Sequence, residues 1–215
     1  MKNNILISGV NGFVGQNLLS YLKKNNQSRI NGVSRKSNGD YIKSYQELTF
    51  ELWSNIKVFI HLAGKAHDLK KTSLESEYFD VNTELTKTLF NQFLESKCEV
   101  FIFMSSVKAV ADKVEGVLEE SETPKPITAY GKSKLAAEEY ILSQKLPEGK
   151  RIYVLRPCMI HGPGNKGNLN LLYNFVSRGI PYPFGKYENE RSFVSVENLC
   201  FIINELIENK SISSG

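Results

Sequence analysis

The chain has 215 residues, of which 41% are hydrophobic and 23% charged, and its formal net charge is +4 at pH 7. This composition is ordinary for a globular protein, and no run of lysines and arginines with interleaved aromatic residues indicates a nucleic-acid-binding surface. No apolar stretch approaches the ~20 residues that span a membrane, and the first residues lack the pattern of a signal peptide. We therefore expect a cytoplasmic protein with neither a membrane nor a nucleic-acid partner.

The spacing of cysteines and histidines indicates neither a disulfide nor a metal site. The cysteines lie far apart without a CxxC pair, and the histidines lack metal-ligand spacing. We expect reduced thiols that pack as small apolar residues, and no metal. His61 stands inside an apolar run and is expected to be a packed strand residue, not a catalyst. The residues concerned are Cys98, Cys158, Cys200, His61, His67 and His161.

The first segment predicts a strand, a glycine turn and a helix. Residues 4–8 are an apolar run, Gly9, Gly12 and Gly15 follow with GxxGxxG spacing, and residues 16–22 have helical periodicity. Glycines let the backbone approach a pyrophosphate, and the N-terminus of a helix offers unpaired N–H groups to the anion. This order predicts a dinucleotide-binding turn, with an ordinary tight turn as the alternative.

The end of the second predicted strand, residues 29–34, is where an adenosine ribose is usually recognised. An acidic residue there would accept hydrogen bonds from the 2′-hydroxyl, but this chain has Ser34, Arg35 and Lys36. Cations suit a 2′-phosphate, so the sequence favours NADP over NAD. The alternative is a solvated basic turn.

Strands and helices alternate along the rest of the chain, which indicates a doubly wound parallel sheet with right-handed crossovers. We expect an α/β Rossmann domain over residues 1–160 and a small, incomplete substrate-binding lobe over residues 161–215. The predicted strands are 44–45, 57–62, 99–104 and 151–155; the predicted helices are 50–53, 76–96, 130–142, 171–176 and 196–209; and loops are expected at 110–126 and 162–168.

Small and polar residues follow the predicted strands at their carboxyl ends. Ala63 and Gly64 leave room for a ligand, and Ser106 is placed to bind a reacting oxygen. Tyr130 and Lys134 lie one helical turn apart, so we expect the ammonium to lower the pKa of the phenol. Such a tyrosine exchanges a proton with a sugar hydroxyl while a hydride moves. Each feature alone also fits an ordinary turn or a surface helix.

Taken together and in this order, the motifs resemble those of the extended short-chain dehydrogenase/reductase superfamily, specifically its nucleotide-sugar epimerase/dehydratase group. The resemblance covers essentially the whole chain. A closer similarity is to bacterial reductases and epimerases of UDP-N-acetyl-sugars used in surface polysaccharide synthesis. The motifs are Gly9-x-x-Gly12-Phe-x-Gly15, His61-Leu-Ala63, Val81-Asn82, Ser105-Ser106-Val-Lys108, Tyr130-x-x-x-Lys134, Arg156-Pro157, Gly162-Pro-Gly-Asn-Lys166-Gly-Asn168 and Arg191-Ser-Phe-Val.

The resemblance implies a hydride-transfer site that uses NAD or NADP. By matching positions, Tyr130 is the acid/base, Lys134 lowers its pKa and holds the nicotinamide ribose, and Ser106 binds the substrate oxygen. Asn82 corresponds to an asparagine near the catalytic lysine, and Arg191 to an arginine that grips the diphosphate. The implied cofactor-binding residues are Gly9, Asn11, Gly12, Phe13, Val14, Gly15, Ser34, Arg35, Leu62, Ala63, Gly64, Asn82 and Lys134, and the implied substrate contacts are Ser106, Lys108, Tyr130, Lys166, Asn168 and Arg191.

The activity implied by the resemblance is that of an epimerase or reductase acting at a hexose carbon, C4 of a UDP-sugar. A nucleotide-sugar dehydratase and a non-catalytic NAD(P)-binding or redox-sensing protein are the alternatives. A homodimer is expected through helices 76–96 and 130–142. The chain departs from the family pattern at Val110-Ala111, where a Tyr-Gly or Asn-Gly pair is usual, and it ends before the elements that complete the family's substrate lobe.

Overall fold

The computed structural model describes residues 4–25, 29–35, 42–66, 74–114, 116–165, 168–179 and 190–215. Its centre is a six-stranded sheet in the order β3-β2-β1-β4-β5-β6, and each neighbouring pair is parallel. This is the order of a doubly wound dinucleotide-binding sheet, so the predicted Rossmann fold is confirmed. The strands are β1 (Asn4–Ser8), β2 (Arg29–Ser34), β3 (Ile42–Ser44), β4 (Val58–His61), β5 (Val100–Met104) and β6 (Arg151–Leu155).

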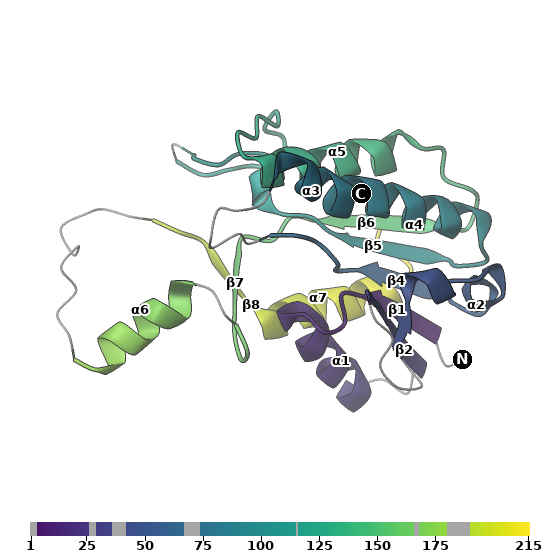
Figure 1. The fold of residues 1–215 in the computed structure, drawn as a ribbon, viewed down its shortest axis with the longest axis horizontal. Helices are drawn as coiled ribbons and strands as arrows, with labels where there is room; N and C mark the ends of the chain where they lie inside the picture. Colours follow the sequence, from purple (N-terminus) through teal and green to yellow (C-terminus); the bar gives the residue numbers. More distant parts are fainter. Residues whose placement is uncertain are drawn as a thin grey trace.

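Helices cover both faces of the sheet (Figure 1). Strand residues alternate between two cores: Ile5 and Ile7 of β1 pack on one face, whereas Leu6 packs on the other. Because both faces are covered, the central strands are continuous apolar runs, as the sequence showed. One face is covered by α1 (Phe13–Asn25) and α7 (Val196–Glu208), and the other by α2 (Phe50–Ser54), α4 (Leu85–Glu95) and α5 (Ala129–Ser143).

The helix predicted for residues 76–96 is not continuous. It is divided into α3 (Glu75–Phe79), a π-helical turn (Asp80–Glu84) and α4. The π turn places Asn82 and Thr83, which are both buried, toward α5. Single π turns inside helices are common at functional sites, and this one brings a polar pair to the carboxyl edge of the sheet.

The C-terminal part of the chain adds a small second layer of structure. β7 (Met159–His161) pairs in parallel with β8 (Phe193–Ser195), beside α6 (Asn168–Ser177) and away from the main sheet (Figure 1). The sequence did not predict β7, because three residues carry too little periodicity. α7 belongs to the core under the main sheet, although it lies in the range expected for the lobe. In the described part of the chain, no helix has the length and apolarity needed to cross a membrane.

Candidate active site

The glycine turn follows β1 at the point where the strand order reverses between β1 and β4. Gly9 has φ +70°, and a Cβ there would lie 2.8 Å from the backbone nitrogen of Ala63. A Cβ on Gly15 would overlap the Gly9 carbonyl oxygen. These glycines therefore let the turn pack closely between β4 and α1. The Gly12 amide closes the turn by donating to the Gly9 carbonyl at 2.9 Å, and α1 begins at the next residue, Phe13.

The Lys134 side chain is buried at the carboxyl end of β5. Its Nζ donates to the Met104 carbonyl at 2.7 Å and lies 4.7 Å from the centroid of the Phe103 ring. Burial lowers the pKa of Lys134 to about 8, and the negative charge of Glu138 acts in the opposite direction. A Cβ on Gly64 would lie only 3.1 Å from this Nζ. A side chain at position 64 would therefore press against the ammonium, and glycine avoids this contact.

Asn82 connects this lysine to the segment after β4. Its Oδ1 accepts from the Lys65 amide at 2.7 Å, and its Nδ2 donates to the Lys65 carbonyl and to Ser133 Oγ, both at 3.0 Å. The hydroxyl of Thr83, the next residue of the π turn, donates to the Ser133 carbonyl at 2.8 Å. Asn82 is therefore not a surface residue. It fixes the 62–65 segment against α5.

The Ser106 side chain lies close enough to the Tyr130 hydroxyl to influence its pKa. Burial raises the pKa of Tyr130 and Ser106 lowers it, and the net change is upward. The expected lowering by Lys134 was therefore wrong for the protein alone. The reason is geometric: the ammonium points to the Met104 carbonyl, so it is not among the causes that shift the phenol. The structure nevertheless brings Ser106, Tyr130 and Lys134 to one edge of the sheet, as predicted.

The first turn of α5 is held against the short turn that follows Ser106. The Asp112 carboxylate accepts from the amides of Ile127 and Thr128 at 2.8 and 3.0 Å. The Thr128 side chain in turn caps α5 by accepting from the Gly131 amide at 3.2 Å. A Cβ on Gly131 would overlap the Lys108 carbonyl oxygen. This close packing sets the approach of Tyr130 to Ser106.

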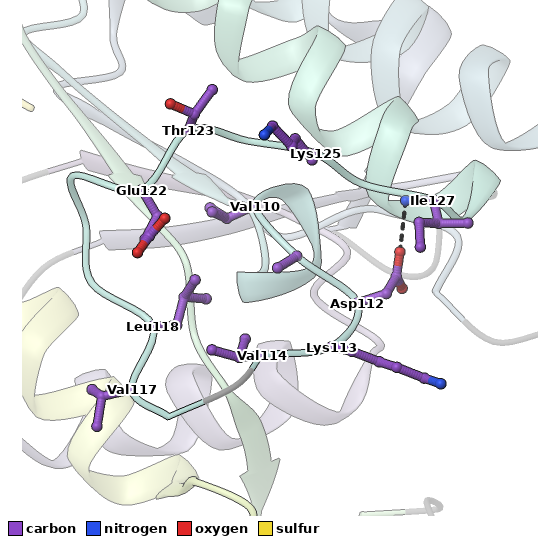
Figure 2. Close-up of a pocket in the computed structure, with 11 residues that line it drawn as sticks. Val110, Asp112, Lys113, Val114, Val117, Leu118, Glu122, Thr123, Lys125 and Ile127 are labelled. Atoms are coloured by element: carbon purple, nitrogen blue, oxygen red, sulfur yellow. Dashed lines mark hydrogen bonds between the residues drawn. The ribbon is translucent and has the colours of Figure 1, made fainter.

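A pocket of about 420 Å³ lies inside the loop that joins Ser106 to Tyr130 (Figure 2). The departure from the family pattern, Val110-Ala111, forms part of its wall, so an apolar surface stands where a tyrosine hydroxyl or an asparagine amide is usual. The lining residues are Val110, Ala111, Asp112, Lys113, Val114, Val117, Leu118, Glu122, Thr123, Lys125 and Ile127.

Two polar residues, buried Glu138 and half-buried Arg156, were not expected as part of the site. Glu138 lies one helical turn after Lys134 and is 1% exposed. Its carboxylate accepts from the Ser105 hydroxyl and from the Arg156 guanidinium, with Nη2–Oε2 at 2.5 Å and Nε–Oε2 at 3.0 Å. The sequence signal was present but weak: an acid four residues after Lys134, and an arginine directly after the last apolar strand.

His61 is a packed strand residue, as predicted. Its Nδ1 lies 2.6 Å from Ser8 Oγ, and its Nε2 lies 2.9 Å from Thr86 Oγ1, which donates to the Asn82 carbonyl at 2.7 Å. Since the Thr86 hydroxyl donates to Asn82, Nε2 carries the proton and Nδ1 accepts from Ser8. Complete burial, with a smaller contribution from Lys134, lowers the pKa of His61 to about 3. The neutral ring thus links β1 and β4 to the π turn.

Comparison with known proteins assigns the chain to a family. The model of the NAD dependent epimerase/dehydratase family matches residues 5–214. The chain belongs to this family. A member from Vibrio cholerae, described as UDP-glucose 4-epimerase, is 33% identical over 224 residues, which cover 97% of this chain and 67% of that protein. An Escherichia coli O157:H7 protein, N-acetyl-alpha-D-glucosaminyl-diphospho-ditrans,octacis-undecaprenol 4-epimerase, is 28% identical over 219 residues, covering 97% and 64%.

A solved structure has the same fold. The UDP-N-acetylglucosamine 4-epimerase from Bacillus cereus superposes with a TM-score of 0.82 at 23% identity, covering 99% of this chain and 74% of that one. The present chain therefore spans about two thirds of the length of the two curated relatives and three quarters of the solved one.

Several residues implied by the epimerase/dehydratase pattern are exposed. Arg35 is exposed directly after β2, and Arg191 is exposed shortly before β8. Lys108 is an exposed partner of Asp112, with Nζ–Oδ1 at 3.4 Å. Asn168 begins α6, and Lys166 lies outside the described residues.

The remaining implied cofactor residues lie in the glycine turn, in the first turn of α1 and at the ends of β2 and β4. Asn11 is exposed in the glycine turn, and Phe13 and Val14 form the first turn of α1 and pack partly into the core. Ser34 ends β2, and Leu62 follows β4.

Cys98 and Cys200 are buried free thiols, and Cys158 is half-buried. Within the described ranges, no group of three or more histidine, cysteine, aspartate or glutamate side chains is arranged to hold a metal.

Proposed function

We propose that the protein transfers a hydride between NAD(P) and a carbon of a nucleotide-bound sugar, C4 of the hexose, with Tyr130 as acid/base. One observation carries the proposal. Tyr130, whose pKa the neighbouring Ser106 side chain lowers, lies at the same edge of the sheet as buried Lys134 and the glycine turn, where strand order reverses. Ligands of doubly wound sheets bind in the crevice at this point.

The residues present fit a dinucleotide. The turn at Gly9 and Gly12 and the N-terminus of α1 would hold the pyrophosphate, because glycines let the backbone come close to phosphates and the helix N-terminus offers unpaired N–H groups. Gly64 is exposed beside the buried Lys134, and in this scheme the nicotinamide ribose approaches the ammonium across this glycine. When bound, oxidised nicotinamide accepts a hydride and carries a positive charge that favours the phenolate of Tyr130.

The protein's own groups handle the proton. The Ser106 hydroxyl, which neighbours the Tyr130 hydroxyl, would bind the sugar oxygen and align it with the phenol. Tyr130 would take the proton of a hydroxyl during oxidation and return it to the ketone oxygen during reduction. Lys134, held by the Met104 carbonyl, would bind ribose hydroxyls and supply a positive charge on the cofactor side.

Epimerase and reductase remain joint candidates, and each has support. The similar proteins from Vibrio cholerae and Escherichia coli are described as 4-epimerases. The exposed cation at Arg35 favours NADPH and a 4-keto reductase. Related folds were solved with UDP-sugars and NAD. A dehydratase and a non-catalytic NAD(P)-binding protein are the alternatives. Retention of Ser106, Tyr130 and Lys134 favours catalysis. A homodimer through α4 and α5 stays a prediction.

A substrate panel tests the proposal. UDP-hexoses, their N-acetyl and 4-keto forms and a polyprenyl-diphospho-sugar are incubated with NAD, NADP, NADH or NADPH, and products are identified by mass spectrometry and NMR. We expect turnover of at least one nucleotide sugar that is lost in Tyr130→Phe while cofactor binding is kept. Cofactor binding without turnover of any sugar would support the non-catalytic alternative. Retained activity in Tyr130→Phe would refute the mechanism.

A further inference from the structure

Glu138 is a buried carboxylate that the proposed chemistry does not use. It lies on α5 one turn after Lys134, and its oxygens are bonded to the Ser105 hydroxyl and the Arg156 guanidinium. A buried ion pair generally adds little to stability over a well-packed apolar pair. The presence of a charged network inside the site therefore invites a role beyond holding the fold together.

The network joins three elements that carry site residues. Beside the side-chain bonds, the Ser105 amide donates to the Leu155 carbonyl at 2.7 Å, and the Val107 amide donates to the Pro157 carbonyl at 3.2 Å. The backbone on both sides of Ser106 is thus paired with the backbone on both sides of Arg156. Because Glu138 binds both segments, α5 is fixed relative to the ends of β5 and β6.

Glu138 is also the anion that acts on Lys134. Burial disfavours the ammonium, and Glu138 is the group that offsets burial. The other titratable groups nearby do not replace it: His61 of β4 is neutral because burial lowers its pKa to about 3, and the uncharged phenol of Tyr130 has a raised pKa. The cation of Arg156, from the end of β6, is bonded to Glu138 and weakens its effect.

We propose that Glu138 is a positioning residue for the active site: it holds Lys134 as the ammonium and, through Ser105, fixes the strand end that carries Ser106. The activity readout of this assignment rests on the proposed function, whereas the titration of Lys134 does not. Glu138 touches neither the reacting atoms nor the cofactor in this scheme. It acts through its two neighbours.

The first test replaces Glu138 with glutamine, which keeps an acceptor for Ser105 and removes the charge. A charge one helical turn away in a partly buried setting changes a pKa by about one to two pH units. We expect the titration midpoint of Lys134 to fall by about one pH unit. This midpoint is measured by NMR of protein whose lysines carry 13C at Cε, and the Lys134 signal is assigned by its loss in Lys134→Met. The pKa of the alkaline limb of the kcat/KM profile should fall by the same amount.

Two further variants separate charge from geometry. Arg156→Gln keeps the carboxylate and removes its partner cation, so the Lys134 midpoint should rise. Ser105→Ala keeps the charge and removes the hydroxyl, so kcat should fall several-fold with the alkaline limb unmoved. If Glu138→Gln does not fold, the upward shift of the Lys134 midpoint in Arg156→Gln still tests the assignment. An unchanged or lowered midpoint there, or a folded Glu138→Gln with normal Lys134 titration, overturns the assignment.

If the Lys134 midpoint moves as expected but no nucleotide sugar is turned over, the proposed function fails and the role of Glu138 in setting the charge of Lys134 stands. If turnover is found and the midpoint does not move, the proposed function stands and the role of Glu138 is refuted.

Discussion

Replacing Lys134 with methionine is expected to remove activity and stabilise the fold at pH 7. Burial lowers the pKa of this lysine from 10.5 to about 8, and a difference of this size corresponds to about 3 kcal/mol of unfavourable free energy in the folded protein. Methionine has a similar length and needs no hydration. It leaves the Met104 carbonyl without its donor and removes one of the two cations near Glu138, which together cost about 1–2 kcal/mol. The expected net gain is about 1–2 kcal/mol.

The gain depends on pH, and its sign follows from the two pKa values. Between pH 8 and the ordinary lysine value, Lys134 has lost its proton in the folded protein but keeps it in the unfolded chain. The unfolded state therefore binds more protons, and the free energy of unfolding of the unmodified protein rises with pH across this window. Lys134→Met lacks this contribution, so its advantage should shrink from pH 8 upward, vanish at about pH 9 and reverse by about pH 10.

Urea denaturation of both proteins at pH 7, 8, 9 and 10 measures the difference. Other groups titrate in this range, but they are common to both proteins and cancel in the comparison. The reasoning is refuted if Lys134→Met is less stable at pH 7, or if the difference between the two proteins does not change with pH.

Three further predictions concern the turn, the buried histidine and the cofactor. Gly9→Ala should cost more than ~3 kcal/mol in urea denaturation, because its Cβ meets the Ala63 backbone, whereas Gly149→Ala, also at positive φ but with open space around it, should cost about 1–2 kcal/mol. Equal losses of stability in the two variants would show that the backbone of the glycine turn moves to accommodate a Cβ. The His61 ring should show no NMR titration down to pH 4, and a midpoint near 6.5 would contradict its burial. Arg35→Ala should weaken NADP binding about tenfold more than NAD binding. Equal weakening of both would show that Arg35 does not discriminate NADP from NAD.

The local patterns predicted most of the fold, because they depend on residues close in sequence. The strand, glycine turn and helix at the start of the chain are visible in the order of apolar residues and glycines, and the structure has them within a few residues. The sheet's parallel order follows from the alternation of strands and helices. β7 was missed because a three-residue strand is stabilised only by its partner, β8, more than thirty residues later.

The sequence predicted which candidate residues lie near one another, but not their electrostatics. Spacing placed Tyr130 and Lys134 on one face of a helix, yet only the structure shows that the ammonium bonds the Met104 carbonyl and that burial governs the phenol. The π turn depends on Asn82 reaching Ser133 in another helix. No periodicity encodes such a contact.

Glu138 is a second residue whose environment could not be predicted from the sequence. In the sequence it stands in a pair of glutamates, Glu138-Glu139, that resembles the solvent face of a helix. Glu139 is indeed exposed, and Glu138 is buried. The distinction comes from Arg156, which arrives from the end of β6 and supplies the partner that a buried carboxylate needs.

The central claim is that Tyr130 moves the proton while a hydride passes between the nicotinamide and the sugar. Rapid mixing of cofactor-loaded protein with its sugar substrate, followed by the absorbance of reduced nicotinamide, tests this directly in the unmodified protein and in Tyr130→Phe. The account predicts a transient or stoichiometric change in reduced nicotinamide in the unmodified protein and none in Tyr130→Phe, at equal cofactor affinity. An equally fast change in Tyr130→Phe, or product formed without any change in the nicotinamide, would contradict it.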